Sequence, residues 1–187
     1  MKTNSLLNSA NMEKVNSLIE DTEKNVQEFN NICSKILKQY SESLDNFMAD
    51  LYVECIKTEN APTEVLEKYF LELSNLLYFM QEKLEQSSIF SDMSESAAKE
   101  IYSKTYLDNQ VKEVTTGKNK TTVAELVAKA ELGAQYESVV ANIYEHVYQA
   151  LKNKINSAQD MLSTIRKILS GRQTEMNFST YTRRVEE

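Results

Sequence analysis

The side chains that could do catalytic chemistry in this 187-residue chain are few, and none has the neighbours that catalysis needs. The only histidine, His146, follows Glu145, and adjacent residues of a helix do not share a face. No Glu-x-x-His pair is present, so a di-iron or zinc site inside a helical bundle lacks its ligands. Neither Cys33 nor Cys55 has the spacing to other ligands that a zinc site needs or the partner residues of a catalytic triad. The sequence therefore predicts a protein that is not an enzyme and uses no metal or other cofactor.

Basic side chains and tyrosines remain as residues that could bind a ligand. Lysine and arginine neutralise phosphates and gain from counterion release, and aromatic faces beside cations suit the stacking of unpaired bases. The alternative is that these residues form ordinary solvated helix faces and helix–helix contacts with tyrosine hydroxyls at the rim. The candidate nucleic-acid-binding residues are Lys99, Lys104, Lys112, Lys118, Lys120, Arg166, Lys167 and Arg172, with Tyr102 and Tyr106 as stacking candidates at i,i+4 spacing.

The net charge of −7 conceals an asymmetry between the two halves of the chain. Residues 1–98 hold 8 basic and 17 acidic residues, a balance of −9, whereas residues 99–187 hold 13 and 11, a balance of +2. An acidic front half with a basic rear half is compatible with nucleic-acid binding by the rear half, without requiring it.

Helices must position these residues, because the chain has only three glycines and one proline. β-rich and α/β folds of this length use many more turn-forming residues. Apolar spacing predicts an all-α fold with a long N-terminal amphipathic helix at about 11–57 and further helices at about 62–86, 93–114 and 122–170. The last two form an antiparallel αα-hairpin at about 93–170. We expect an elongated protein with a flexible lead at 1–10, a helical assembly region at 11–90, a helical hairpin at 91–171 and a tail at 172–187.

Local signals set the expected helix ends. Pro62 is tolerated in a first helical turn, and the serine-rich stretch 87–91 predicts a joint followed by a capping box at Asp92 and Glu95. A basic loop at 115–120 precedes a second capping box at Thr122 and Glu125. The apolar stripe falters at 133–137, which favours a kink there, and Gly171 suits the position just after a helix end.

An 11-residue repeat runs along the helix predicted at 11–57. Eleven residues in three turns is close to the natural α-helix, so the stripe should pack in a straight or slightly right-handed bundle. A helix of about 70 Å cannot be covered by one small globule, so partner subunits of a homo-oligomer are the expected cover. The repeat comprises Val15, Leu18, Thr22; Val26, Phe29, Cys33; Leu37, Tyr40, Leu44; Met48, Leu51 and Cys55, and the predicted oligomer seam is Val15, Leu18, Val26, Phe29, Leu37, Tyr40, Leu44, Met48 and Leu51.

The chain shows no sign of a membrane or secreted location. Residues 1–10 lack the apolar core of a signal peptide, and the most apolar stretch, 71–80, is too short to span a bilayer. Cys33 and Cys55 are about 33 Å apart on one straight helix, which excludes a disulfide between them. Buried free thiols in a reducing compartment fit a cytoplasmic protein.

One part of the chain resembles a known family. The resemblance rests on SAAKEIYSKTYLD at 96–108, KTTVAEL at 120–126, and a long helix that ends in IRKILS at 165–170. This order resembles the UvsY-type recombination mediators of large tailed phages and small helical phage proteins like them, in which a basic, tyrosine-containing helix end and a loop precede a long helix with a basic end. The resemblance covers about 75 residues. Lys104, with Leu107 and Asp108, stands in the place of the family's basic stretch, and Tyr106 replaces its arginine.

The resemblance implies a ring-like oligomer that binds single-stranded DNA and helps load a recombinase, in the host cell cytoplasm. Lys104 is then the DNA-contacting lysine, residues 96–172 bind DNA, and residues 11–86 serve assembly or partner contact. The alternative is a non-enzymatic virion scaffold, helical adaptor or inhibitor that acts through protein–protein contacts. One continuous basic groove favours DNA binding, whereas basic residues scattered over the surface favour the scaffold or adaptor.

Overall fold

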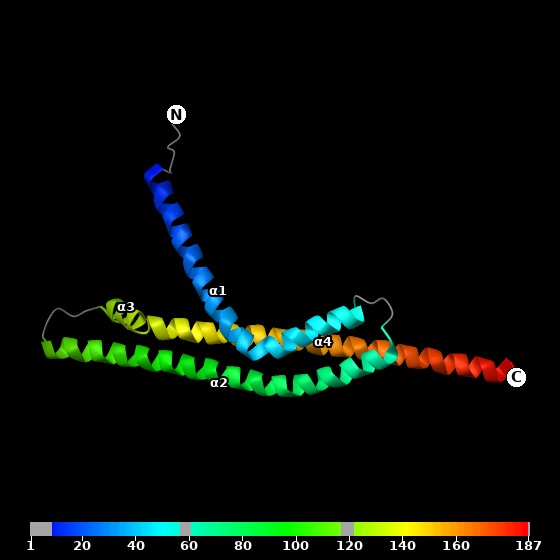
Figure 1. Ribbon diagram of the computed structural model, residues 1–187. Coiled ribbons are helices and arrows are strands. Elements are labelled where there is room, and N and C mark those ends of the chain that lie inside the picture. The colour runs from blue at the N-terminus through cyan, green and yellow to red at the C-terminus, as the bar shows by residue number, and fades with distance from the viewer. Residues whose placement is uncertain (1–8, 57–60, 117–121, 187) are drawn as a thin grey trace, which may run out of the picture.

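Helices build nearly all of the chain in the computed structural model, which describes residues 9–56, 61–116 and 122–186. The elements are α1 (Ser9–Leu51), a π-helical turn η1 (Tyr52–Ile56), α2 (Thr63–Thr116), α3 (Val123–Gly133) and α4 (Gln135–Glu186). No strand occurs in the described ranges. Figure 1 shows α2 and α4 side by side as a long antiparallel hairpin, with α1 lying across it. The predicted elongated all-α fold, with its hairpin and long N-terminal helix, is confirmed.

The seam between α2 and α4 repeats every seven residues along α2. A seven-residue repeat is the spacing that keeps one stripe of a helix facing a partner along its whole length. Up to Leu84 the seam positions are large and apolar, and from Ser87 to Ala98 they are serine or alanine. The two halves of the hairpin are therefore held differently. The buried and half-buried seam positions of α2 are Leu66, Phe70, Leu73, Leu77, Met80, Leu84, Ser87, Ser91, Ser94 and Ala98.

The second half of α1 covers the apolar half of the hairpin and completes a three-helix core. Leu44 and Leu51 of α1 are 1% exposed and pack with Leu73 and Met80 of α2 and Leu151 of α4, all of which are fully buried. Each such side chain contributes about 1.5–3 kcal/mol by leaving water. Phe47 meets Tyr69 edge to face at 5.5 Å in the same core. The core therefore lies at one end of the hairpin, where α1, α2 and α4 meet.

Two predicted helix boundaries are wrong. The joint expected at 87–91 and the capping box at Asp92 and Glu95 fall inside α2, which runs unbroken from Thr63 to Thr116. Ser87 and Ser91 are seam residues, 1% and 7% exposed, so packing against α4 overrides their weak helix propensity. The boundary between the predicted assembly region and hairpin, at 90/91, therefore falls inside one helix, and that division stays a prediction.

The predicted helix end at Gly171 and the irregular tail at 172–187 are also wrong over the described residues, because α4 continues to Glu186. A glycine inside a helix costs about 1 kcal/mol relative to alanine, which does not end a helix. The next residue, Arg172, donates a hydrogen bond to the carbonyl oxygen of Ala61 at 2.7 Å and one to Oγ1 of Thr63 at 3.3 Å. These bonds tie α4 to the start of α2 just where the end was expected.

Two other boundary predictions are confirmed. Thr122 and Glu125 form a capping box, in which Thr122 Oγ1 accepts from the Glu125 amide at 3.3 Å and Glu125 Oε2 accepts from the Thr122 amide at 3.0 Å. The expected kink is the break between Gly133 and Gln135, where Ala134 lies outside both helices. The lead predicted at 1–10 and the loop predicted at 115–120 are helical where the structure describes them, since α1 begins at Ser9 and α2 ends at Thr116. Residues 1–8, 57–60 and 117–121 lie outside the described residues.

A close contact explains why glycine stands at the end of α3. A Cβ atom added to Gly133 would lie 2.8 Å from Cγ2 and 3.0 Å from Oγ1 of Thr105 on α2. Real Cβ atoms essentially never come within 3.0 Å of another heavy atom. The absence of a side chain at Gly133 therefore lets the kink lie directly against α2.

No helix in the described ranges is both long and apolar enough to cross a membrane.

Candidate functional site

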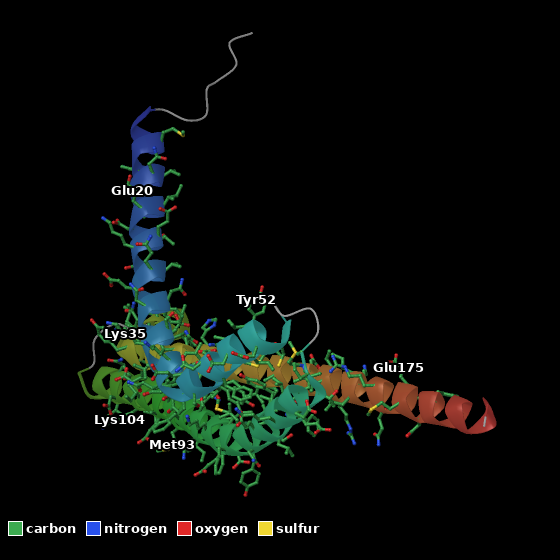
Figure 2. The ribbon with its side chains drawn as sticks, turned by 45° about the vertical axis from the view of Figure 1, so that its right-hand side comes forward. Glu20, Lys35, Tyr52, Met93, Lys104 and Glu175 are labelled. Carbon is green, nitrogen blue, oxygen red and sulfur yellow. The ribbon has the colours of Figure 1, made fainter. Side chains whose placement is uncertain are left out.

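The first half of α1 projects from the hairpin, as Figures 1 and 2 show. We define the α1 arm as residues 9–28. All of its described side chains are exposed, including large apolar ones, of which Leu18 is 66% and Val26 is 51% exposed. At 1.5 Å per residue the arm is about 30 Å long. Its exposed large apolar side chains are Met12, Val15, Leu18, Ile19 and Val26.

The apolar stripe of the arm continues the stripe that the chain buries. Phe29, directly after the arm, is half-buried and meets His146 of α4 edge to face at 5.3 Å. From there the predicted seam residues Leu37, Tyr40, Leu44, Met48 and Leu51 lie within the chain's own core. The chain, and not a partner subunit, therefore covers this half of the predicted seam. Only Val15, Leu18 and Val26, beyond Phe29, keep an uncovered face.

The arm is acidic as well as apolar. Residues 9–28 contain five acidic residues and two lysines, a net charge of −3. Leu18 and Val26 face one side of the helix, whereas Ser17 and Lys24 face the other. The arm is therefore a lone amphipathic helix, which is the form that helix-in-groove recognition uses.

Of the predicted nucleic-acid-binding lysines at the loop end of the hairpin, the structure describes the side chains of Lys99 and Lys104. Lys99 forms an ion pair with Glu95 one turn away on α2. Lys104 is exposed on the same helix, as Figure 2 shows. The side chain of Lys112, and Lys118 and Lys120 altogether, lie outside what the structure describes.

The remaining predicted basic residues lie at the opposite end. Arg166 and Lys167 are exposed on α4, and Arg166 lines a groove with Glu67 of α2. Glu67 is 37 residues from Lys104 along α2, about 55 Å at 1.5 Å per residue. Arg172, in contrast, is half-buried and bonded to the start of α2. The described candidate residues therefore form two groups far apart along the hairpin, and Arg172 holds α4 to the start of α2.

Tyr102, a predicted stacking residue, lines an open hollow of about 770 Å³ between α2 and the α3–α4 junction. Lys99 lines it too, but so do Glu95 and Glu131. Two carboxylates against one ammonium disfavour a phosphate in this hollow. Tyr106, the other stacking candidate, is half-buried on α2.

The other tyrosine pair makes contacts within the chain. Tyr144 stacks on Phe90 with ring centroids 5.6 Å apart, and Tyr148 has the Lys152 ammonium 5.8 Å from its ring centroid. The Tyr144 contact agrees with the alternative that tyrosines line helix–helix contacts, whereas Tyr148 and Lys152 lie on the same helix, α4.

A groove marks the place where α4 runs past the start of α2. We call it the α4-end groove, with a volume of about 470 Å³. Phe70 and Leu169 are half-buried apolar residues in its wall, and Arg166 and Glu67 bring one charge of each sign. Residues 163–186 of α4 contain five basic and two acidic residues, a net charge of +3. The lining residues are Thr63, Glu67, Phe70, Arg166, Leu169, Ser170, Gln173 and Met176.

Sequence reasoning missed a polar cluster that joins α1 to α4. The Lys154 ammonium donates to both carboxylate oxygens of Asp45 at 2.6 Å and to Oγ of Ser41 at 3.2 Å, and Ser41 Oγ donates to Asp45 at 2.8 Å. Partial burial raises the pKa of Asp45, but the hydrogen bonds from Lys154 and Ser41 and the lysine charge outweigh it, so the pKa lies below its ordinary value. The cluster fixes the register of α1 on the hairpin.

The two cysteines are free and half-buried, and burial raises the pKa of both thiols. A raised pKa leaves little reactive thiolate at neutral pH. Among the described residues, no group of three His, Cys, Asp or Glu side chains converges as metal ligands would.

Comparison with known proteins gives no relative to set beside this geometry: no family model, no curated protein and no solved structure matches the chain. The surfaces that the fold exposes therefore carry the functional argument.

Proposed function

We propose that this chain is a non-enzymatic helical adaptor or assembly protein that acts through protein–protein contacts made by the α1 arm. The supporting observation is the uncovered apolar stripe of the arm, in line with a stripe that the same helix buries against α2 and α4. Exposed apolar patches rimmed by polar residues mark interaction sites. A lone helix also gains little stability by itself in water, so a partner that covers the stripe stabilises it.

The positions of the basic candidates that the structure describes favour this proposal over nucleic-acid binding. Lys99 is paired with Glu95, Arg172 is bonded to Ala61, and Lys104 is about 55 Å from the groove that Arg166 lines. Such scattering is what an adaptor surface predicts.

A photo-crosslinking residue in place of Leu18, used in the cells that make the protein, tests the proposal. The same residue in place of Ser17, on the opposite face of the arm, is the matched control. We expect a discrete, protease-sensitive adduct from position 18 and none from position 17. Equal adducts at both positions, or none at position 18, contradict the proposal.

A second candidate function is that of a single-stranded-DNA-binding recombination mediator that helps load a recombinase. The observation in its favour is the +3 charge of residues 163–186, with Arg166 and Lys167 exposed. Fluorescence anisotropy of a labelled single-stranded oligonucleotide, beside a matched duplex at low and moderate salt, tests it. This candidate predicts salt-sensitive binding that prefers single strands and is lost in Arg166→Glu/Lys167→Glu. Absence of binding at low salt rules it out.

A further inference from the structure

Two surfaces with uncovered apolar side chains lie at different places on this molecule. The α1 arm offers an apolar stripe on an acidic helix, and the α4-end groove offers apolar walls on a basic helix. We infer that the α1 arm of one copy docks in the α4-end groove of a second copy. The inference rests on the proposed function, because it names the partner of the arm.

The net charges of the arm and of the α4 end favour arm-to-groove docking over the packing of two arms together. Two arms packed together would bring two charges of −3 side by side, whereas an arm on the α4 end brings −3 against +3. Like charges at an interface are unfavourable, and complementary ones steer association and fix its orientation. The groove itself holds Arg166 and Glu67, so the excess positive charge comes from the rest of the α4 end.

Geometry decides between one copy and two. Phe29, where the arm begins to leave the hairpin, touches His146, and Arg166 lies 20 residues further along α4, about 30 Å away. Figure 2 shows Glu20 on the projecting arm far from Glu175 on the α4 end. Because the arm points away from its own groove, only a second copy can bring the two together.

The chemistry of the contact follows from the residues. Leu18 and Val26, about two turns apart on one face, enter the groove as apolar side chains beside Phe70 and Leu169. The acidic residues that flank the stripe then lie near Arg166. The contact joins two different surfaces, so two copies can exchange arms in a closed pair, and copies that give arm and groove to different neighbours build larger assemblies.

Analytical ultracentrifugation of purified full chain tests the docking with two variants. The arm variant is Leu18→Glu/Val26→Glu, and its control with the same charge change on the other side of the helix is Ser17→Glu/Gln27→Glu. The groove variant is Arg166→Glu/Gln173→Glu, and its control is Lys167→Glu/Thr174→Glu, whose positions do not line the groove. All eight positions have exposed side chains, so the variants should fold.

We expect wild-type chain to form species of two or more chains, with weaker association as salt rises. Each variant alone should be a single chain, and each control should bind at least about tenfold more tightly than its variant, a difference of 1.4 kcal/mol. A mixture of the arm variant and the groove variant keeps one intact arm and one intact groove, so it should give a two-chain species and nothing larger.

Three outcomes overturn the docking. They are a wild-type chain that stays single at every concentration, a variant that assembles like its control, and a mixture that stays single while the wild type assembles. The crosslink at Leu18 separates this failure from failure of the adaptor proposal. If it captures a different protein while the wild type stays single, the adaptor role stands and self-docking is wrong.

Discussion

Substituting Gly133 by alanine tests whether the kink between α3 and α4 needs a glycine for space. The added Cβ would lie 2.8 Å from Cγ2 of Thr105, so one of the two groups must move. Threonine is branched at Cβ and stiff inside a helix, so the strain is not relieved cheaply. Overpacking of this kind costs about 1–3 kcal/mol, and alanine's better helix propensity returns up to about 1 kcal/mol. We expect Gly133→Ala to lower the free energy of unfolding by about 1 kcal/mol.

Gly171 provides the matched control, since it also lies in the helical part of the chain but has nothing within 4 Å of an added Cβ. Gly171→Ala should therefore raise the free energy of unfolding by about 0.5–1 kcal/mol. The same chemical change is thus expected to have opposite signs at two positions.

Urea unfolding followed by circular dichroism measures both effects, and thermal midpoints should shift by about 2–4 °C per kcal/mol for a chain of this size. Removing the obstacle with Thr105→Ala should rescue Gly133→Ala, with a coupling of at least about 0.5 kcal/mol in the double-mutant cycle. The reasoning is refuted if Gly133→Ala is as stable as the wild type, or if Thr105→Ala gives no rescue.

Three further predictions concern polar groups. Oγ of Ser87 is buried without a hydrogen-bond partner among the described residues, so Ser87→Ala should raise the free energy of unfolding in urea by about 1 kcal/mol, and a loss of stability would contradict this. The pKa of Asp45 is lower in the folded state than its unfolded value of about 3.9. The pair of Asp45 with Lys154 therefore stabilises the protein above the unfolded pKa, and this stabilisation is lost as pH falls through the lower folded pKa. Asp45→Asn should therefore cost about 0.5–1 kcal/mol at neutral pH for this partly exposed pair, and urea titrations should show no such cost in strong acid. Thr122→Ala removes the N-cap of α3 and should cost about 1 kcal/mol, with faster amide exchange confined to α3; unchanged exchange there would count against the cap.

The fold class could be predicted from the sequence because its signals are local. Few glycines and prolines, long apolar stripes and the capping box at Thr122 and Glu125 act within one helix, and each appears in the structure. The errors arose where tertiary packing overrides local preference. Ser87 and Ser91 are typical of a joint between helices, but their small side chains are buried in the seam between α2 and α4. Gly171 is typical of a helix end, but α4 continues past it, and Arg172 bonds α4 to Ala61 before the start of α2.

The candidate surfaces could be predicted only in part. The 11-residue repeat correctly marked one face of α1, but no periodicity shows where the cover of that face stops, because this depends on how α1 crosses α4 near Phe29. Contacts between residues far apart in the sequence could not be predicted either. Lys154 binds Asp45, 109 residues away, and no local pattern in the sequence marks the two as partners. The basic residues were chosen by charge alone, and their division between two ends of the hairpin follows from helix direction.

The unequal seam of the hairpin bears on how the chain folds. Hairpins usually close from the turn outward, because contacts near the turn cost the least loop entropy. Here the seam positions from Ser87 to Ala98 carry only small side chains, and the large apolar core residues Leu73 and Met80 of α2 lie 71 to 82 residues from Leu151 and Ile155 of α4 in the chain. The burial of the large core cluster is therefore gained only after a long loop has closed. We therefore expect this protein to fold more slowly than a helical hairpin of the same length whose large apolar contacts lie next to its turn.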